Sequence, residues 1–402
     1  MLAALLCVLL LLPLAIGGFA QGVMTKMLIA ALFATGFGIL IGQAGLLSFG
    51  HAALYGIGAV ATIHVMMLAE RGLFGLPTPL MPLVGGLAGA LLAAFAGYFA
   101  TRRSGAYFTL ITLAMAELVH VVAVQWQPVF GGEAGLTAMR MPWAGITFGT
   151  PVSVYYTTLV WVVVCLVIAW LFTRTPFGRL TVAIRENEER VVFLGYNVHM
   201  SKVIVFAVSG ALSGIAGGLL VMANESVSYS LFIPYVSLEV VFYAFIGGTS
   251  FFLGPAFAAA VLTFLPFALS GMTRLWPLYQ GLLFMLLMLY APTGAAGLLQ
   301  SQAQLLRKLP MSRWLWIQAH GFAGAVFVIG AFVLGAEVTH ATKALDTRTM
   351  AWAAAAVAFI FGIALLQRVR SMVAATESLP DKEIVARNVA TVSVKPVVEV
   401  RP

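Results

Sequence analysis

The chain has 402 residues, of which 61% are hydrophobic and only 9% are charged. So few charges do not solvate the surface of a soluble protein of this length, so the composition excludes that class and indicates a polytopic membrane protein. The net charge of +8 comes from short loops and the C-terminal tail, so it concerns membrane orientation and predicts no nucleic-acid partner. The apolar runs are too long for a β-barrel, whose strands alternate over about ten residues, so we expect an all-α fold.

A bilayer core takes about 20 apolar residues per helix, and apolar segments of this kind follow one another along the chain. We expect about 10–12 transmembrane helices, because several segments are too short for an upright span and are candidates for glycine-broken or re-entrant structure. The segments lie at approximately 1–20, 27–41, 51–69, 80–100, 105–126, 151–172, 202–222, 236–249, 252–270, 276–297, 314–336 and 350–367.

The first apolar segment has two interpretations. Residues 2–12 have the apolar character of a secretory signal, and Gly18 and Ala20 would permit cleavage after it. No Lys or Arg precedes this run, however, whereas a signal begins with a positively charged region. We therefore favour a retained first span.

Basic residues cluster in the loops and predict the orientation of the chain. By the positive-inside rule these loops face the cytoplasm. If every segment crosses, the linkers 127–150 and 223–235 face outward and both termini lie inside the cell. The basic loops contain Arg102 and Arg103, the segment 174–202, Arg307, Lys308 and Arg313, and Arg368 with Arg370.

Two glycine-rich clusters interrupt apolar sequence, one at 42–51 in the front half and one at 247–255 in the back half. Broken backbone at membrane depth must be satisfied by protein or by a watered cavity, and transporters place such breaks beside the substrate. Close helix packing is the alternative, since small residues let membrane helices approach each other. We hold the two interpretations equal for these clusters, and favour packing for Gly85-Gly86 and for Gly214 with Gly217-Gly218.

Four ionisable residues lie within or at the edge of apolar spans, where a charge costs several kcal/mol unless it is paired or hydrated. They are His64, Glu117, His120 and Glu239. Glu117 and His120 are three residues apart on one helix face and within reach of each other. The carboxylates are equally candidates for a translocation path and for interhelical hydrogen bonds, whereas the histidines alone favour the structural role.

A polar segment at 174–201 interrupts the membrane-spanning sequence. Thr175-Pro176 predicts a helix start, and Gly195 predicts a left-handed stop. Leu180, Ile184, Val191 and Leu194 form a broken apolar stripe between them. Two four-residue spacings are suited to ion pairs along one helix, namely Arg185 with Glu189 and Glu186 with Arg190. Periodicity alone favours an ordinary solvated cytoplasmic helix.

The sequence contains no recognisable active site. It lacks a phosphate-binding loop of the Gly-x-x-x-x-Gly-Lys-Ser/Thr type and a Gly-x-Ser-x-Gly elbow, and its histidines lack the spacing of a zinc site. Cys7 and Cys165 lie in apolar runs and are interpreted as buried hydrophobic residues. We therefore predict a protein that is not an enzyme and that has no metal or other cofactor.

Several motifs, in order along residues 27–297, resemble the permeases of branched-chain amino acid ABC transporters of the LivM type. The resemblance is strongest at the segment 175–198, which looks like the cytoplasmic coupling loop of that family, and in the span that follows it. The other similar motifs are 42–53, 107–114, Gly131-Gly132, Gly135-Leu136, Glu239, Gly247-Gly248-Thr249 and Gly254-Pro255. The resemblance thus assigns residues 1–300 to a permease transmembrane domain with a coupling segment at 174–201.

The resemblance implies a permease subunit in the inner membrane. It would act with a second permease subunit, two ATP-binding subunits that hydrolyse ATP, and an extracytoplasmic solute-binding protein. By the same resemblance the coupling residues docked to the ATPase are Arg185, Glu186, Asn187, Glu188, Glu189 and Gly195. The residues near the translocation path are expected to be Gln43, Ser48, His51, Glu117 and Glu239.

The C-terminal part of the chain departs from the family pattern, and the substrate is not determined by the resemblance. The chain continues beyond the usual family end, with an extension at 301–367 that carries two further spans and a polar tail at 368–402 that we expect to be disordered. The substrate is the second open point, because similar permeases carry urea, short amides or other small solutes. A secondary transporter or channel coupled to an ion gradient is an alternative of another class, since buried carboxylates suit proton coupling.

Overall fold

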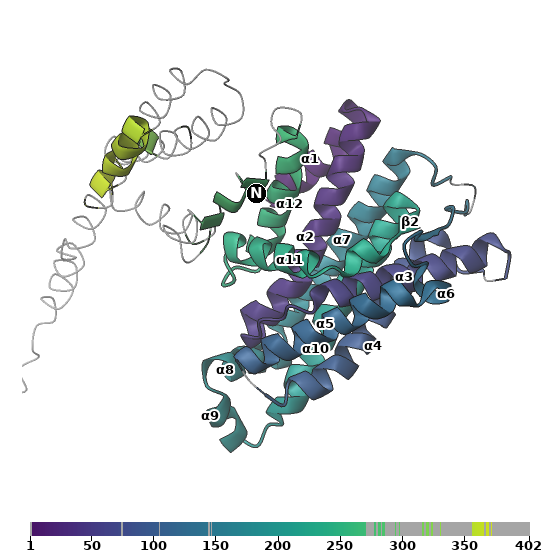
Figure 1. Ribbon diagram of the computed structural model, residues 1–402, viewed down its shortest axis with the longest axis horizontal. Coiled ribbons are helices and arrows are strands. Elements are labelled where there is room, and N and C mark those ends of the chain that lie inside the picture. The colour runs from purple at the N-terminus through teal and green to yellow at the C-terminus, as the bar shows by residue number, and fades with distance from the viewer. Residues whose placement is uncertain are drawn as a thin grey trace, which may run out of the picture. The chain divides into compact units, whose positions relative to one another are not determined.

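The computed structural model describes residues 2–270, apart from positions 74, 104, 144 and 146, and scattered positions between 277 and 371. The chain divides into two compact units, Met1–Leu299 and Gln300–Pro402. Apart from two short strands, the regular structure described in the first unit is helical, so the predicted all-α membrane fold is confirmed (Figure 1).

Among the described residues, six helices are long and apolar enough to cross a membrane. They are α2 (Gly18–Ala44), α3 (His51–Glu70), α4 (Pro82–Ala100, preceded by the 3-10 turn η1, Thr78–Leu80), α5 (Ala106–Gln125), α7 (Pro151–Arg174) and α10 (Val198–Asn224). Shorter elements are α1 (Leu2–Ala15), α6 (Gln127–Phe130), α8 (Pro176–Glu186), α9 (Glu188–Phe193), η2 (Tyr229–Phe232), α11 (Pro234–Gly247) and α12 (Gly254–Leu269). The predicted spans 276–297 and 314–336, and the tail 368–402, lie largely outside the described residues, whereas part of the predicted span 350–367 is described in a short apolar helix, Ala356–Val369.

The first two predicted segments have wrong bounds. Helix α1 ends at Ala15 because Gln21 folds back over its last turn, with Nε2 donating to the carbonyls of Pro13 at 2.8 Å and Ile16 at 3.0 Å. Helix α2 then has 27 residues, far more than the predicted 27–41, since Gly36, Gly38 and Gly42 pack against neighbouring elements and do not break it. The front glycine cluster therefore begins inside a full-length helix.

The core is built around α10, which packs against α4, α3 and α2. A Cβ at Gly214 of α10 would meet the backbone of Gly85 and lie 3.1 Å from the Gly89 Cα, both in α4. Such close approach of two helix backbones requires glycine on both sides. The predicted packing role of Gly85 and Gly214 is confirmed, and Cys165 of α7 is a buried free cysteine as predicted.

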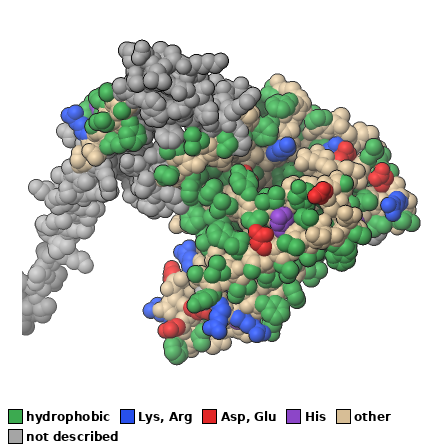
Figure 2. Space-filling model, in the orientation of Figure 1, with side chains coloured by type: hydrophobic (Ala, Val, Ile, Leu, Met, Phe, Trp, Pro, Cys, Tyr) green, Lys and Arg blue, Asp and Glu red, His purple; other side chains and the backbone are tan. Residues whose placement is uncertain are grey.

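The helices of the first unit are connected by different structures at the two ends of the bundle, which we call the strand end and the basic end. At the strand end, β1 (Leu136–Thr137) pairs antiparallel with β2 (Ser226–Val227), which joins the linkers 127–150 and 223–235. At the basic end, Thr101 beside Arg102 and Arg103 contacts His199 of α10, with 3.1 Å between Oγ1 and Nδ1, which brings the α4–α5 loop beside α8 and α9. Figure 2 shows charged side chains gathered at these ends and mostly hydrophobic side chains between them.

Candidate functional site

The polar segment forms two helices, α8 and α9, at the basic end. Thr175 caps α8, its Oγ1 accepting from the Gly178 amide at 3.0 Å, and Pro176 is the first helical residue, as predicted. Asn187 ends α8 with an extended backbone (φ −157°), and its Oδ1 accepts from the Arg190 amide at 2.9 Å to begin α9. Gly195 follows α9 with φ +85°, the predicted left-handed stop.

The break at Asn187 changes the predicted electrostatics of this segment. Among the described residues, the ion pairs expected for Arg185 with Glu189 and for Glu186 with Arg190 do not form, because the i,i+4 relation requires one continuous helix. Glu188 instead pairs with Lys202 of α10, with 2.7 Å between Oε2 and Nζ, and the Lys202 side chain is only 3% exposed. This ion pair ties α9 to the core helix.

An exposed apolar tip on α9 is a feature that the predicted residue set missed. Ile184, Val191 and Val198 form a small buried cluster under α8 and α9. Phe193, by contrast, is 88% exposed, and Leu194 is 69% exposed. The sequence does contain an indication of this exposed tip. Residues 191–194 are four consecutive apolar residues, and one buried helix face cannot hold all of them. A large exposed aromatic beside charged residues is typical of a protein-binding surface.

Arg185 contacts its own chain. Its guanidinium donates a hydrogen bond from Nη1 to the Gly42 carbonyl at the end of α2. The arginine stem crosses Gly45, which ends α2 with φ +68° and where a Cβ would lie 2.6 Å from the Arg185 Cγ. Gly45 thus provides both the left-handed backbone and the space for the arginine.

Polar side chains are buried in and directly after the turn that follows α2. Ser48 and His51 are both fully buried, and the Ser48 Oγ accepts from the Gly50 amide at 3.1 Å. His51 Nε2 lies 2.9 Å from the Ser209 Oγ, which donates to the Gly36 carbonyl at 2.7 Å. Ser209 therefore accepts from His51, and this pair of bonds fixes the crossing of α2, α3 and α10, while Ser48 holds the turn itself.

The two glycine clusters meet each other. A Cβ at Gly42 would lie 2.7 Å from the Thr249 carbonyl oxygen, in the turn between α11 and α12. Gly247 and Gly254 pack backbone to backbone at that turn, which explains why α11 and α12 are short and separate. Gln43 lies half-buried beside this meeting point.

Glu239 is half-buried on α11, where it accepts a hydrogen bond from the Tyr243 hydroxyl one turn away. The Tyr243 oxygen also lies 3.3 Å from the Thr263 Oγ1 of α12. Glu239 is thus hydrogen-bonded within its own helix, and only Tyr243 extends this contact to α12, so the interhelical bond expected of Glu239 itself is not seen among the described residues. The structure brings Gln43, Ser48 and His51 into one region, while Glu117 lies on another helix.

Glu117 lies on α5, the helix with the largest exposed share among the six long ones. Its carboxylate is 47% exposed and stands 3.5 Å from the His120 Nδ1, the pair predicted from their spacing. The His120 ring stacks on Tyr229 at 6.5 Å between centroids. His64 instead donates to the Val129 carbonyl at 2.7 Å, so it has the structural role that we favoured. Glu117 and His120 form an open polar pair on an otherwise apolar face, since Leu110, Leu118 and Val121 are exposed there.

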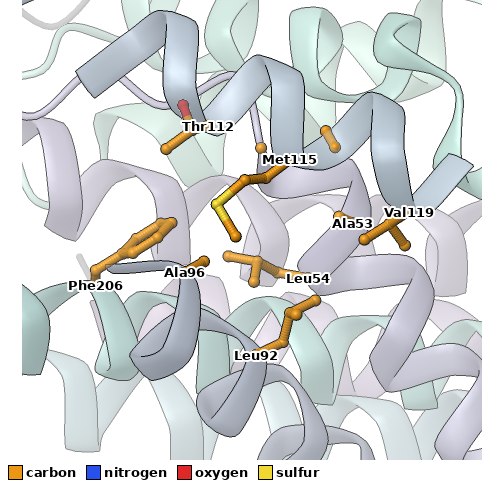
Figure 3. Close-up of a pocket in the computed structure, with 10 residues that line it drawn as sticks. Ala53, Leu54, Leu92, Ala96, Thr112, Met115, Val119 and Phe206 are labelled. Atoms are coloured by element: carbon orange, nitrogen blue, oxygen red, sulfur yellow. The ribbon is translucent and has the colours of Figure 1, made fainter. Parts of the chain in front are cut away.

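A small apolar cavity of about 20 Å³ lies between α5 and the helices behind it. Met115 of α5 points into the cavity, opposite Leu54 of α3, Leu92 of α4 and Phe206 of α10 (Figure 3). An apolar cavity of this size stays dry, and its walls lose contacts that a filled core would make. The inner face of α5 is therefore less firmly held than the faces of α4 and α10.

No group of three or more potential metal ligands occurs among the described residues. The polar side chains described above form hydrogen bonds between helices, an exposed carboxylate–histidine pair on α5, and the charged segment α8–α9.

Comparison with known proteins gives one consistent family. A family model described as "Branched-chain amino acid transport system / permease component" matches residues 19–292. The LivM permease of the high-affinity branched-chain amino acid transport system of Salmonella typhimurium is 26% identical over 76% of each chain. The Escherichia coli LivM protein is 25% identical over 70% of this chain and 71% of its own. The ribose import permease RbsC of Haemophilus influenzae is 29% identical over 53% of this chain and 68% of its own. No solved structure matches the chain.

Proposed function

Because the chain belongs to the family of branched-chain amino acid transport system permease components, we propose that it is one permease subunit of an ATP-driven importer of leucine, isoleucine and valine. The observation that carries this proposal is the similarity to two LivM permeases across at least 70% of each chain. The importer would contain a second permease subunit and two ATP-binding subunits, and a solute-binding protein would deliver the substrate from outside.

The ribose permease relatives provide a second candidate substrate class. They match about half of this chain, whereas the LivM permeases match about three quarters of it, which favours amino acids over sugars. Urea and short amides remain further alternatives within the same transporter class. Proton-coupled transport by the chain alone is the alternative mechanism, and Glu117 would then be its first candidate residue.

We place the basic end of the molecule in the cytoplasm. Arg102 and Arg103 lie there with the segment 174–202, and positive loops are retained on the cytoplasmic side. The strand end then faces the solute-binding protein outside. From the basic loops of the sequence we also propose that both termini lie in the cytoplasm. This orientation puts α8 and α9 on the side where ATP is available.

The tip of α9 is proposed as the docking site for an ATP-binding subunit. Phe193 and Leu194 supply an apolar anchor, and the exposed Glu186 and Glu189 supply charges around it. We expect Phe193→Ala to reduce co-purification of the ATP-binding subunits by about tenfold or more, the loss typical of an aromatic anchor. Phe95→Ala is the matched control, because Phe95 is 62% exposed on α4 within the membrane-spanning part.

We propose that the translocation path runs along the exposed face of α5. Glu117 and His120 are the polar groups on that face, and a second permease subunit opposite them would enclose the path. Gln43 and Glu239 are proposed to contribute at its edge. Ser48 and His51 are buried, so they would not contact the solute and would act only by fixing the turn at the end of α2.

The test is uptake into proteoliposomes that contain this chain with candidate permease and ATPase partners. ATP is enclosed inside, candidate solute-binding protein is supplied outside, and labelled leucine, ribose and urea are compared. Leucine uptake that requires ATP and every subunit would support the whole proposal. Uptake of ribose or urea alone would overturn the substrate, and uptake by this chain alone with a proton gradient would overturn the ABC mechanism.

A further inference from the structure

The contacts around Arg185 form a continuous connection between the coupling helix and the helix that carries Glu117. We propose that Arg185 is a positioning residue that transmits the movement of α8, through the turn at residues 45–50, to α5. The proposal rests on the proposed function, since α8 moves only if an ATP-binding subunit acts on it. It assigns Arg185 a partner within its own chain in place of a contact with the ATPase.

The first step joins α8 to the end of α2. The Arg185 guanidinium donates to the Gly42 carbonyl, one of the last carbonyls of α2, where the helix dipole is negative. The arginine stem lies across Gly45, and only a residue without a side chain leaves room for it there. A cation hydrogen-bonded to a helix end follows the movement of that end more closely than an apolar contact does.

The second step joins the turn to α5. Thr109 of α5 donates from Oγ1 to the Leu47 carbonyl at 2.8 Å, and the Thr112 Oγ1 accepts from the Phe49 amide at 3.2 Å. A Cβ at Gly50 would lie 2.9 Å from the Thr112 carbonyl oxygen, so the two backbones are in close contact. Residues on both sides of Ser48 are thus bound to the first turns of α5.

The third step concerns the stiffness of the turn, which is expected to move as a unit and not to deform when α8 moves. Leu46, Ser48 and Gly50 are buried, so these alternate residues of the turn are packed like core residues, while Gly45 at its start is exposed. Packed elements shift as units between discrete arrangements and do not deform continuously. On the far side, α5 has a cavity behind Met115 and an exposed outer face, so it is the neighbour with room to move.

A second contact joins the segment α8–α9 to the membrane helices, but it leads to α10 and not to α5. Glu188 and Lys202 tie α9 to α10, and α10 is packed between α2, α3 and α4. A push on α8 and α9 therefore reaches the tightly packed α10 through Lys202, whereas through Arg185 it reaches the end of α2 and the turn that is hydrogen-bonded to α5. This difference makes Arg185 the route by which a movement reaches the proposed path.

The main test measures leucine imported per ATP hydrolysed in the reconstituted complex. We expect Arg185→Gln to lower this ratio by about tenfold or more, the effect of losing a charge-assisted hydrogen bond, while ATP hydrolysis and subunit co-purification stay within about twofold. Arg185→Lys should restore part of the ratio, because its ammonium still donates to a carbonyl. Arg179→Gln, an exposed arginine on the same helix, is the matched control. A normal ratio in Arg185→Gln, or a parallel loss of assembly and hydrolysis, would overturn the proposal.

A pair of glycine variants tests the contact itself. Gly45 and Gly72 both follow a long helix with left-handed backbone, at φ +68° and +70°, but a Cβ at Gly72 would meet no atom within 4 Å. Gly45→Ala should therefore lower the import ratio where Gly72→Ala does not. In an Arg185→Ala background the difference should disappear, because the Cγ that Gly45→Ala would strike is gone. A difference that persists there would count against the contact.

A substrate-free measurement separates this inference from the proposed function. Hydrogen exchange of α5 amides is compared between the ADP–vanadate-trapped and the nucleotide-free complex. In the wild type, trapping should change exchange at residues 109–119, and in Arg185→Gln it should not. If leucine is not transported but this difference is found, only the substrate proposal fails. If leucine is transported and Arg185→Gln behaves as wild type, only the Arg185 connection fails.

Discussion

Helices α10 and α5 have similar apolar composition but differ in what surrounds them. The most apolar 18-residue window of α10 is 67% buried within the chain, whereas that of α5 is 22% buried. Helix α10 presents Ser209, Gly210 and Gly214 to neighbouring helices, and α5 presents exposed leucine and valine with Glu117 among them. One helix is a scaffold, and the other is available to a lipid, a partner subunit or a solute.

This difference shows that the hydrophobicity of a membrane helix does not predict how tightly the helix is packed. Lipid is as apolar as leucine, so large apolar side chains gain little by turning inward, and small residues make the close contacts. The tightly packed helix is therefore the one with glycine and serine. Among the described residues the Glu117 carboxylate bonds only to His120 of its own helix and to no neighbouring helix, which is why we place it on the path.

The largest expected effect is on the scaffold side of this comparison. Gly214→Ala places a methyl group against the backbone of Gly85 and Gly89, which cannot move apart without separating α10 from α4. We expect a loss of about 3 kcal/mol in the free energy of unfolding, measured by SDS titration in mixed micelles. Gly22→Ala is the control, since its Cβ would meet no atom within 4 Å, and it should be neutral or stabilising by up to about 1 kcal/mol. Equal effects at both positions would contradict the close packing of α10.

One methionine in each helix allows the packing of α10 and α5 to be compared directly. Met222 of α10 is 2% exposed, whereas Met115 of α5 borders a cavity. Met222→Ala should cost about 2–4 kcal/mol of unfolding free energy, within the range for a buried methionine. Met115→Ala should cost about half as much, because fewer contacts are lost, and the same titration measures both. A larger loss at Met115 would mean that α5 belongs to the rigid core.

Thr112 tests how the inner end of α5 is fastened. Thr112→Val keeps the shape of the side chain but removes the acceptor of the Phe49 amide. Leaving that amide unpaired should cost about 1–2 kcal/mol of unfolding free energy. Thr157→Val is a matched control, because among the described residues the Thr157 hydroxyl bonds only to the Ser153 carbonyl of its own helix, 2.8 Å away. If both variants unfold alike, the turn is not anchored by α5.

The smallest effect on stability is expected at Glu117, together with a clear effect on transport. Glu117→Gln keeps the size of a side chain that is 47% exposed, so unfolding should change by less than about 0.5 kcal/mol. Uptake by the assembled importer should fall by about tenfold, because a polar contact on the path is weakened. Glu70→Gln, an exposed carboxylate at the end of α3, should leave uptake unchanged. Normal uptake by Glu117→Gln would remove α5 from the path.

The sequence by itself determined the class of the molecule and most of its long helices. Apolar runs at 51–69, 80–100 and 105–126 correspond closely to α3, α4 and α5, because a lipid-spanning helix must be apolar over its whole length. Thr175-Pro176 and Gly195 marked the coupling segment, since caps depend on local backbone geometry. The order of motifs predicted the family that the comparisons then found.

Only the tertiary structure decided which residues face each other. The pairing of the two glycine clusters, the direction of Arg185 toward Gly42, and the exposure of Phe193 depend on contacts between segments far apart in the chain. The predicted ion pairs within the coupling segment were wrong because Asn187 interrupts the helix that would have formed them. Hydropathy reports the preference of each residue for an apolar environment, but lipid and protein interior are both apolar. The sequence pattern therefore identifies the spans, and packing alone determines which face of each span is inside.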